Sequence, residues 1–320
     1  IVWFFNMLFP FDIKYKFTYN LFSKESTAKL LDRCKKQTEP HGKSYAGFVI
    51  DRVLHLEAGM KYKDIVEKDN FLIGWIEGVD NQTAYSFSQI LNSMINESYE
   101  WQKNFVSSLN SDTIIENLKN IKTEYLYDWA NFLNRLTFFR NSKWSKSFCA
   151  KIPREEIGSA MRKSNINDIY GLTEMLCTLK HMNKEFCFIE YYDCIGIIQN
   201  SMKENFMRTL ENIDLDFLMY ILGENLFDLG KPTKDQKDAG IAFVKCITSE
   251  MIHNSIFEGT PKDWDTLFRF AGEIFRYDPQ KFISAIKDAD FNVLNDTTAE
   301  LWNSPNDALV KLLYMIYQVA

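Results

Sequence analysis

The sequence predicts an all-α protein, more specifically an α-solenoid of about five to six helix-pair units with a period of about 42–43 residues. The first observation is a ten-residue phrase that occurs at residues 85–94, 127–136 and 170–179, in steps of 42 and 43 residues. The second is the placing of its apolar side chains at the first, third, sixth, seventh and tenth positions, which is the spacing of one helix face and not the alternation of a strand. The third is the small number of prolines and glycines, 7 and 13, which suits helices with short connections.

Residues 1–63 do not follow the period, and we interpret them as a helical lead-in to a repeat domain over residues 64–320. Within the lead-in, residues 26–34 and 44–56 predict two helices, separated by a break at residues 39–42 that contains proline and glycine. The chain begins at Ile1 with a short apolar run that has neither the basic start nor the cleavage site of a signal peptide. We therefore expect this chain to be an internal fragment of a longer one.

A second helical element, upstream of the phrase, recurs with the same period. Its apolar positions are matched 43 residues later: Trp101, Phe105, Leu109, Ile114 and Leu118 correspond to Trp144, Phe148, Ile152, Ile157 and Met161. The stretches 110–112 and 153–155 predict helix starts, because each has a capping side chain or a proline followed by an acid. Each unit is therefore predicted as two short helices around a break, followed by the phrase helix.

The period weakens toward the C-terminus. Phe217, Leu218 and Ile221 still lie 42 residues after their equivalents in the third copy of the phrase. Residues 223–240 contain glycine, proline and many charges, which predict an exposed loop or insertion between units. Isolated helix pairs cannot bury both faces, so neighbouring units are expected to stack. An irregular all-α protein, whose amphipathic helices resemble one another by chance, is the open alternative.

Composition limits the classes of function. A content of 46% hydrophobic and 15% aromatic residues favours a fully folded chain, and a net charge of −6 argues against a dedicated nucleic-acid binder. No stretch approaches about eighteen apolar residues, so no membrane span is expected. The six cysteines show no Cys-x-x-Cys spacing and favour buried thiols in a reducing cytoplasm.

Three groups of residues could carry chemistry, and each has a simpler structural explanation. Gly42-Lys43-Ser44 resembles the end of a phosphate-binding loop, but Gln37 stands where that loop needs its first glycine. The acidic doublets at 214–216 and 288–290 lack the further ligands and the glycine turn of a calcium loop. The four histidines, none of them three or four residues from another, are His41, His55, His181 and His253. We therefore predict no catalytic, cofactor-binding or metal-binding residue.

Aromatic residues are the remaining signal. The repeated phrase does not account for the aromatic residues Tyr191-Tyr192, Phe138-Phe139 and Trp302. Aromatic anchors are favoured at protein interfaces, but in a chain so rich in phenylalanine we expect these residues to pack in the core. The tyrosine, aromatic and leucine positions of the phrase itself are explained by stacking. Function is then expected in the 223–240 segment and in the polar positions between the apolar ones.

The repeat units also carry a family resemblance. Paired helices such as Trp144-Ser145-Lys146-Ser147-Phe148 through Ile157-Gly158-Ser159-Ala160-Met161, and the helix start Tyr277-Asp278-Pro279-Gln280, resemble the C-terminal helical-repeat regions of bacterial STAND-type, NLR-like defence NTPases. The resemblance covers most of residues 64–320, rests on spacing, and is similar in kind to HEAT and TPR arrays. It implies a sensor that grips a foreign or phage protein, with an NTPase domain that drives oligomerisation outside this chain. No site residue of the family can be carried over.

The leading hypothesis is a non-catalytic α-solenoid that binds a protein partner through its concave face, as the sensing part of a larger defence protein. Curvature from small rotations between repeats creates such a groove. A helical enzyme or nucleic-acid-processing subunit with active residues on loops, and a structural adaptor, are the alternatives.

Overall fold

A computed structural model describes residues 24–54, 71–182, 189–213, 241, 243–257, 266–267, 278–287 and 317. Every regular element in these ranges is helical, so the all-α prediction is confirmed for the described part of the chain. The chain forms two compact units, Ile1–Met161 and Arg162–Ala320. The predicted boundary after residue 63 falls between described segments and stays a prediction.

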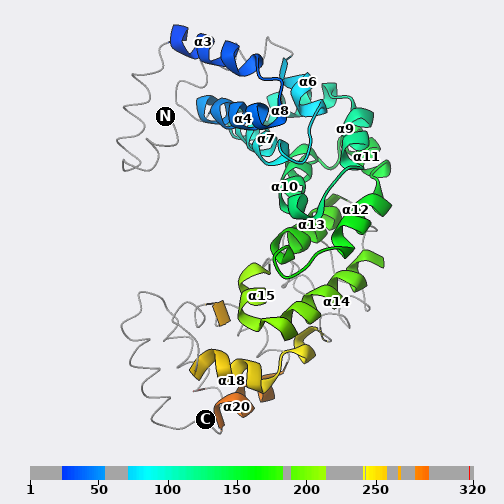
Figure 1. Ribbon diagram of the computed structural model, residues 1–320. Coiled ribbons are helices and arrows are strands. Elements are labelled where there is room, and N and C mark those ends of the chain that lie inside the picture. The colour runs from blue at the N-terminus through cyan, green and yellow to red at the C-terminus, as the bar shows by residue number, and fades with distance from the viewer. Residues whose placement is uncertain are drawn as a thin grey trace. The chain divides into compact units, whose positions relative to one another are not determined.

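The first unit contains one run of short helices, coloured from blue to green in Figure 1. They are α3 (Lys24–Lys35), α4 (Pro40–Leu54), α6 (Phe71–Glu77), α7 (Ala84–Glu97), α8 (Tyr99–Ser108), α9 (Ser111–Leu118), the 3-10 turn η1 (Thr123–Tyr125), α10 (Leu126–Leu136), α11 (Lys143–Ala150) and α12 (Arg154–Arg162). The two helices predicted in the lead-in correspond to α3 and α4, but the break between them covers residues 36–39, because α4 already begins at Pro40 within the predicted break of residues 39–42.

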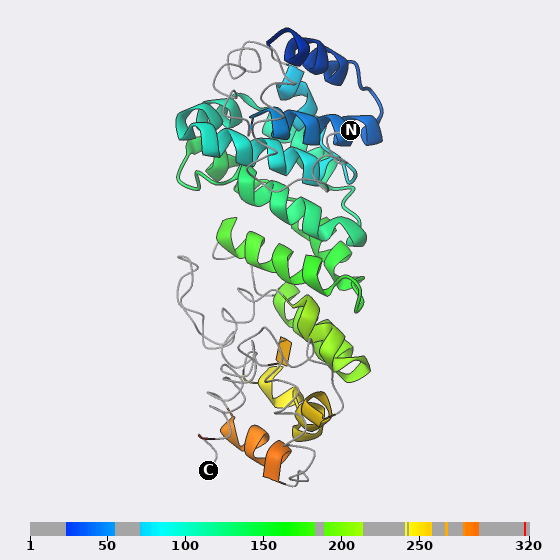
Figure 2. The ribbon, with the colours of Figure 1, turned by 90° about the vertical axis from the view of Figure 1, so that its left-hand side faces the viewer.

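The helices of the first unit pack in two layers. Helices α4, α7 and α10 lie side by side in one layer, whereas α6, α9 and α11 follow one another in the second (Figures 1 and 2). The core between the layers contains the large side chains Phe87, Trp129, Phe132 and Phe148, all of them fully buried. Burial of an aromatic side chain of this size stabilises the fold by roughly 2–3 kcal/mol.

Polar side chains fix where these helices begin. Asn110 accepts a hydrogen bond from the backbone N–H of Asp112 (3.1 Å) at the start of α9, so the predicted helix start at 110–112 is confirmed. Ser98 and Ser142 cap α8 and α11 in the same way. Helix α12 begins at Arg154, directly after Pro153, so this proline precedes the helix and does not occupy its first position.

The phrase helix of residues 127–136 shows which of its positions form the core. Trp129, Phe132, Leu133 and Leu136 are buried as expected. The tyrosine at the first position is different: Tyr85 and Tyr127 are half-buried, and Tyr170 is 41% exposed. The first position therefore lies at the edge of the buried stripe, where Tyr85 of one phrase helix still stacks on Tyr127 of the next. The polar positions 128, 131, 134 and 135, expected in solvent, are all half-buried.

The second unit is also helical in its described segments. Its helices are α13 (Ile169–Met182), α14 (Ile189–Glu204), α15 (Phe206–Asn212), α18 (Ser249–Phe257) and α20 (Pro279–Lys287). Helix α14 packs on α15, and α18 packs on α20. Helix α20 begins at Pro279, which confirms the helix start predicted there. The Nζ atom of Lys281 donates to the backbone oxygens of Val244 (2.6 Å) and Ile247, so this cation satisfies carbonyls that end a helical segment.

Candidate functional site

Helices α4, α7 and α10 each direct one row of side chains away from the core. Members of a row follow one another at intervals of four, three and four residues, which keeps them on one side of a helix. The rows are His41, Tyr45, Phe48 and Arg52 on α4, Tyr85, Gln89, Asn92 and Asn96 on α7, and Tyr127, Asn131, Asn134 and, directly after the helix, Phe138 on α10. We call these side chains the layer face. All of them are exposed or half-buried.

An aromatic row crosses the layer face from helix to helix. The rings of Phe48 and Tyr85 lie 5.9 Å apart between centroids, and Tyr85 stacks on Tyr127 at 6.0 Å with 30° between the ring planes. On α4, the ring of His41 meets Tyr45 edge-on at 4.8 Å. Tyr45 is 63% exposed, so these rings form a surface and not a core. Contacts in this range stabilise an aromatic pair by about 0.5–1.5 kcal/mol beyond their buried area.

Side-chain amides fill the layer face beside the aromatic row. The amide of Asn131 donates to the backbone oxygen of Tyr127 at 2.9 Å. The amides of Asn92, Asn96 and Asn134 make no hydrogen bond to any residue in the described part of the chain. Each such amide offers two donors and an acceptor, the same groups that pair with the main chain of another polypeptide.

Two aspartates belong to the helices that carry the aromatic row. Asp51 is buried where α4 meets α7, accepts a hydrogen bond from the Ser93 hydroxyl (2.6 Å), and lies 3.9 Å from the exposed Arg52 guanidinium. Asp128 is half-buried at the start of α10, and loss of hydration raises the pKa of its carboxyl to about 6. Burial also raises the pKa of the Tyr85 phenol, with further contributions in the same direction from Tyr127, Asp128 and Asp51. Arg52 acts in the opposite direction on the Tyr85 phenol, so the charge of Asp51 is partly compensated.

Gly47 allows α4 to approach α7 closely. A Cβ atom at this glycine would lie 2.9 Å from the Ser86 hydroxyl oxygen and 3.0 Å from its Cβ. No side chain larger than hydrogen fits without movement of one helix. This close approach brings Phe48 within reach of Tyr85 and so connects the first two rows.

A second aromatic cluster lies at the other end of α10. Tyr99, 62% exposed, stacks on Phe138 at 5.9 Å with 5° between planes, and Phe139 meets Phe138 edge-on. Core packing was expected for Phe138-Phe139, but Phe138 is 39% exposed because the chain leaves the helix just before it. The periodic pattern contains no signal that points to Tyr99. Nearby, Gln102 is fully buried and donates to the backbone oxygen of Arg135 (3.0 Å), while its own side-chain oxygen has no partner among the described residues.

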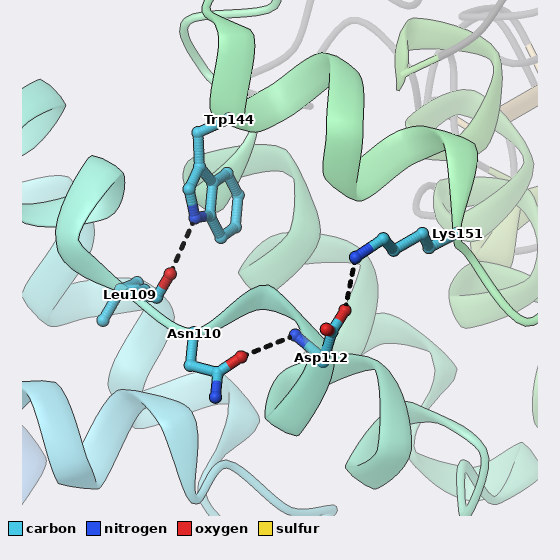
Figure 3. A network of polar contacts seen from close by, with 5 residues as sticks. All are labelled: Leu109, Asn110, Asp112, Trp144 and Lys151. Carbon is cyan, nitrogen blue, oxygen red and sulfur yellow. Dashed lines mark hydrogen bonds and ion pairs between the residues drawn. The ribbon is translucent and has the colours of Figure 1, made fainter.

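Many polar side chains between the apolar positions join neighbouring segments and so have structural roles. Figure 3 shows one such joint: the Trp144 indole donates to the backbone oxygen of Leu109 (2.8 Å), and Lys151 pairs with Asp112 at 2.6 Å. A second joint centres on Asn81, which accepts from the Trp129 indole at 2.8 Å. The polar positions expected to carry function are thus divided between these joints and the layer face.

The residues considered for chemistry are dispersed. Gly42-Lys43-Ser44 lies in the first turns of α4, so these residues belong to a helix and not to a loop. His41 is exposed, His181 lies in the last turn of α13 as expected, and Nδ1 of His253 lies 2.8 Å from the backbone oxygen of Ala285. His55, the acidic doublets, the 223–240 segment, Trp302 and the side chains of Tyr191-Tyr192 lie outside the described residues.

The described cysteines carry free thiols. Cys34, Cys177 and Cys194 are buried, whereas Cys149 and Cys246 are half-buried. Burial raises the pKa of the Cys34 and Cys149 thiols to about 11, so both are protonated at neutral pH. Within the described ranges, no group of three or more His, Cys, Asp or Glu side chains could hold a metal ion. None of the helices in those ranges has the length and apolar character to cross a bilayer.

No family model, curated protein or solved structure gives a significant match to this chain. The arrangement of side chains is therefore the basis for the proposals that follow.

Proposed function

We propose that this chain is a non-catalytic helical-repeat region, an α-solenoid with a period of about 42–43 residues, that binds a protein partner on the layer face. The observation that supports the architecture is that polar contacts between segments join residues 32–48 positions apart, and several of them lie close to one period. Four that lie near one period have separations of 42 residues for Ser93–Asp51, 41 for Lys122–Asn81, 39 for Lys151–Asp112 and, in the second unit, 41 for Arg208–Asn167. A contact that recurs at nearly one period is what stacking of successive repeats requires.

The composition of the layer face supports binding of protein. Its solvent-facing side chains are aromatic rings and amides, together with the Arg52 guanidinium and the His41 imidazole. Centres of protein interfaces are depleted in charge and enriched in aromatic residues, because those rings bury much area at little cost in conformational entropy. The exposed rings of Tyr99 and Phe138 extend the same chemistry beyond the C-terminal end of α10.

The wider role that we propose is the sensing part of a larger STAND-type defence protein in the cytoplasm. The helical pairing, the period and the helix start at Pro279 support it, as does the resemblance that they carry. The free thiols of the described cysteines fit a reducing compartment. In this proposal, the partner is a foreign or phage protein, and an NTPase domain outside this chain supplies catalysis and oligomerisation.

The architecture is tested by deleting one period. Removal of residues 85–126, which is 42 residues, joins the second copy of the phrase to the residue that preceded the first. A solenoid is expected to keep its helicity per residue and a cooperative melt, because each repeat contacts only its neighbours. The matched control removes residues 85–105, half a period, and is expected to lose cooperative unfolding. Equal disruption by both deletions, measured by circular dichroism, would contradict the solenoid.

Binding is tested by selection from displayed peptides. The purified chain is the bait for random peptides of about 12 residues, which span roughly 40 Å when extended. We expect enriched peptides that bind the wild type but not the Tyr85→Ala/Tyr127→Ala variant, once circular dichroism has shown that this variant is folded. The control is Lys146→Ala on α11, where the side chain is exposed and away from the layer face. Peptides that bind all three proteins alike, or no enrichment at all, would overturn the proposal.

A further inference from the structure

We infer that α3 and α4 form a repeat unit of the same kind as the units that contain α7 and α10, and that α4 is the end helix of its layer. The inference rests on the proposed function, because it extends the proposed array and sets where the layer face begins. The array would then start before residue 64, within the segment predicted as a lead-in.

The core positions of α4 recur in α7 and α10 with a nearly constant register. Each of four positions in α4 lies 41 residues before its equivalent in α7, which lies 42 residues before its equivalent in α10. All of these side chains are buried, with at most 7% of their surface exposed. The sets are Ala46, Phe87 and Trp129; Ile50, Leu91 and Leu133; Val53, Met94 and Leu136; and Leu54, Ile95 and Thr137. Helix α4 therefore turns the same face to the core as the phrase helices do, although its own sequence does not repeat the phrase.

Helix α3 corresponds in the same way to α6 and α9. Leu31, Leu72 and Ile114 are separated by 41 and 42 residues, and each of them is at most 1% exposed. The Nζ atom of Lys35, at the end of α3, lies 5.2 Å from the centre of the Phe71 ring at the start of α6, so α3 contacts α6. Helix α3 precedes α4 as α6 precedes α7 and α9 precedes α10. The pair α3–α4 thus contributes one helix to each layer.

Two serines show how a phrase helix meets the preceding helix of its layer. A Cβ atom at Gly47 of α4 would lie 2.9 Å from the hydroxyl oxygen of Ser86 on α7. Seven residues further along α7, the Ser93 hydroxyl donates to the Asp51 carboxylate at 2.6 Å. Ser86 and Ser93 are 0% and 1% exposed. Small, buried side chains therefore line the side of α7 on which α4 packs.

The equivalent side of α4 is open. The positions 41 residues before the two serines hold Tyr45, which is 63% exposed, and Arg52, whose side chain is 59% exposed. A helix packed on this side, as α4 is packed on α7, would bury both side chains. Terminal repeats of a solenoid need a polar outer side for solubility. Helix α4 is therefore the end helix of the layer, and the surface proposed to bind a partner has an edge along it.

A deletion that keeps the register tests the repeat unit. Removal of residues 46–86, which is 41 residues, joins Tyr45 to Phe87 and leaves one phrase helix in place of α4 and α7. The core positions stay on one face, so we expect a cooperative thermal melt with unchanged helicity per residue, measured by circular dichroism. The matched control removes residues 46–84, two residues fewer, and turns the second half of the fused helix by about 200°. This control is expected to lose the cooperative melt.

The outcomes separate this inference from the proposed function. Loss of the cooperative melt in both deletions, with retention in the deletion of residues 85–126, would place the start of the array after α4 and refute the inference alone. Retention in the control deletion would show that the register of α4 does not matter, and would refute the inference as well. Loss in all three deletions would overturn the proposed function too.

Thiol labelling at equivalent positions tests whether α4 is the end helix. The new thiol lies on the outer side of α4 in Arg52→Cys, and at the equivalent position between α4 and α7 in Ser93→Cys. We expect a disulfide reagent to label the first at least about 100-fold faster than the second in the native chain, and both alike in denaturant, as measured by mass spectrometry of the peptides. Slow labelling of both would show that another segment covers α4, and rapid labelling of both would show that α4 does not pack on α7. Either result would refute the inference.

Discussion

Gly47 lies where α4 approaches α7, and its replacement by alanine would test how tightly the layer is packed. The new methyl group would lie 2.9 Å from the Ser86 hydroxyl oxygen and 3.0 Å from the Ser86 Cβ, well inside van der Waals contact. Rotation of the Ser86 side chain could relieve only the first of these clashes, because Cβ is fixed to the backbone. That hydroxyl also donates to the Thr83 backbone oxygen at 3.0 Å, so its movement has a cost.

The expected net effect of Gly47→Ala is a loss of about 1–2 kcal/mol in the free energy of unfolding. Overpacking of a well-packed contact costs typically about 1–3 kcal/mol, whereas alanine gains about 1 kcal/mol over glycine within a helix. The matched control is Gly74→Ala in α6, where an added Cβ meets nothing within 4 Å. At this position only the higher helix propensity of alanine acts, so Gly74→Ala should be more stable than the wild type by roughly 0.5–1 kcal/mol.

The free energy of unfolding of both variants is measured by urea denaturation followed by circular dichroism. The m-value, which is the slope of that free energy against urea concentration, should match that of the wild type, so that the same transition is compared. A double-mutant cycle with Ser86→Ala isolates the contact, because part of the clash is removed in that background. We expect the cost of Gly47→Ala to fall by at least half there. Stabilisation of the chain by Gly47→Ala, to the same extent as by Gly74→Ala, would refute the close approach of α4 and α7.

Three further predictions follow from polar and titratable groups. Asn81→Ala removes the acceptor of the Trp129 indole (2.8 Å) and should lower stability by about 1–3 kcal/mol in urea denaturation, because a donor loses its partner; a change below ~0.3 kcal/mol would contradict this. For Asp128, the folded-state pKa of about 6 lies above the ordinary value of 3.8, so the folded state binds this proton more tightly and stability should fall as pH rises from about 4 to about 7. The Asp128→Asn variant should not show that fall, and near pH 7.5 it should be more stable than the wild type by at most about 3 kcal/mol. If the free energies of unfolding of the two proteins instead changed in parallel with pH, the Asp128 carboxyl would be hydrated in the folded chain. The Cys34 and Cys149 thiols, with pKa values of about 11, should react slowly with a disulfide reagent near pH 8 in the native chain and rapidly in denaturant, which mass spectrometry of the labelled peptides would show.

Periodicity predicted the helices well because it reports burial directly. The phrase positions held by Trp129, Phe132 and Leu133 are buried, and the break at 110–112 is a capped helix start. The same reasoning could not tell that Tyr85 and Tyr127 are only half-buried, because a tyrosine at helical spacing from core residues does not show how near it lies to the edge of the buried stripe. Only the packing of one phrase helix on the next decides this.

The layer face could be predicted only in part. Intervals of four, three and four residues recur among Tyr85, Gln89, Asn92 and Asn96, so the row on one helix is readable from the sequence. The contact between Phe48 and Tyr85 is not readable, because it depends on the approach permitted at Gly47. The contact of the exposed Tyr99 with Phe138 could not be predicted from the sequence either, because Phe138 lies 39 residues away and outside the repeated phrase.

The joints between segments have a consequence for the evolution of the chain. In several of them a side chain donates to a backbone oxygen: the Trp144 indole to Leu109, the Asn117 amide to Glu77, and the Thr123 hydroxyl to Ala160. A backbone oxygen is present whatever residue occupies the accepting position, so the acceptor can mutate freely while the joint persists. One segment can then diverge in sequence without a matched change in the segment that it contacts. The surface of such a chain can change in sequence faster than the contacts that hold its helices together.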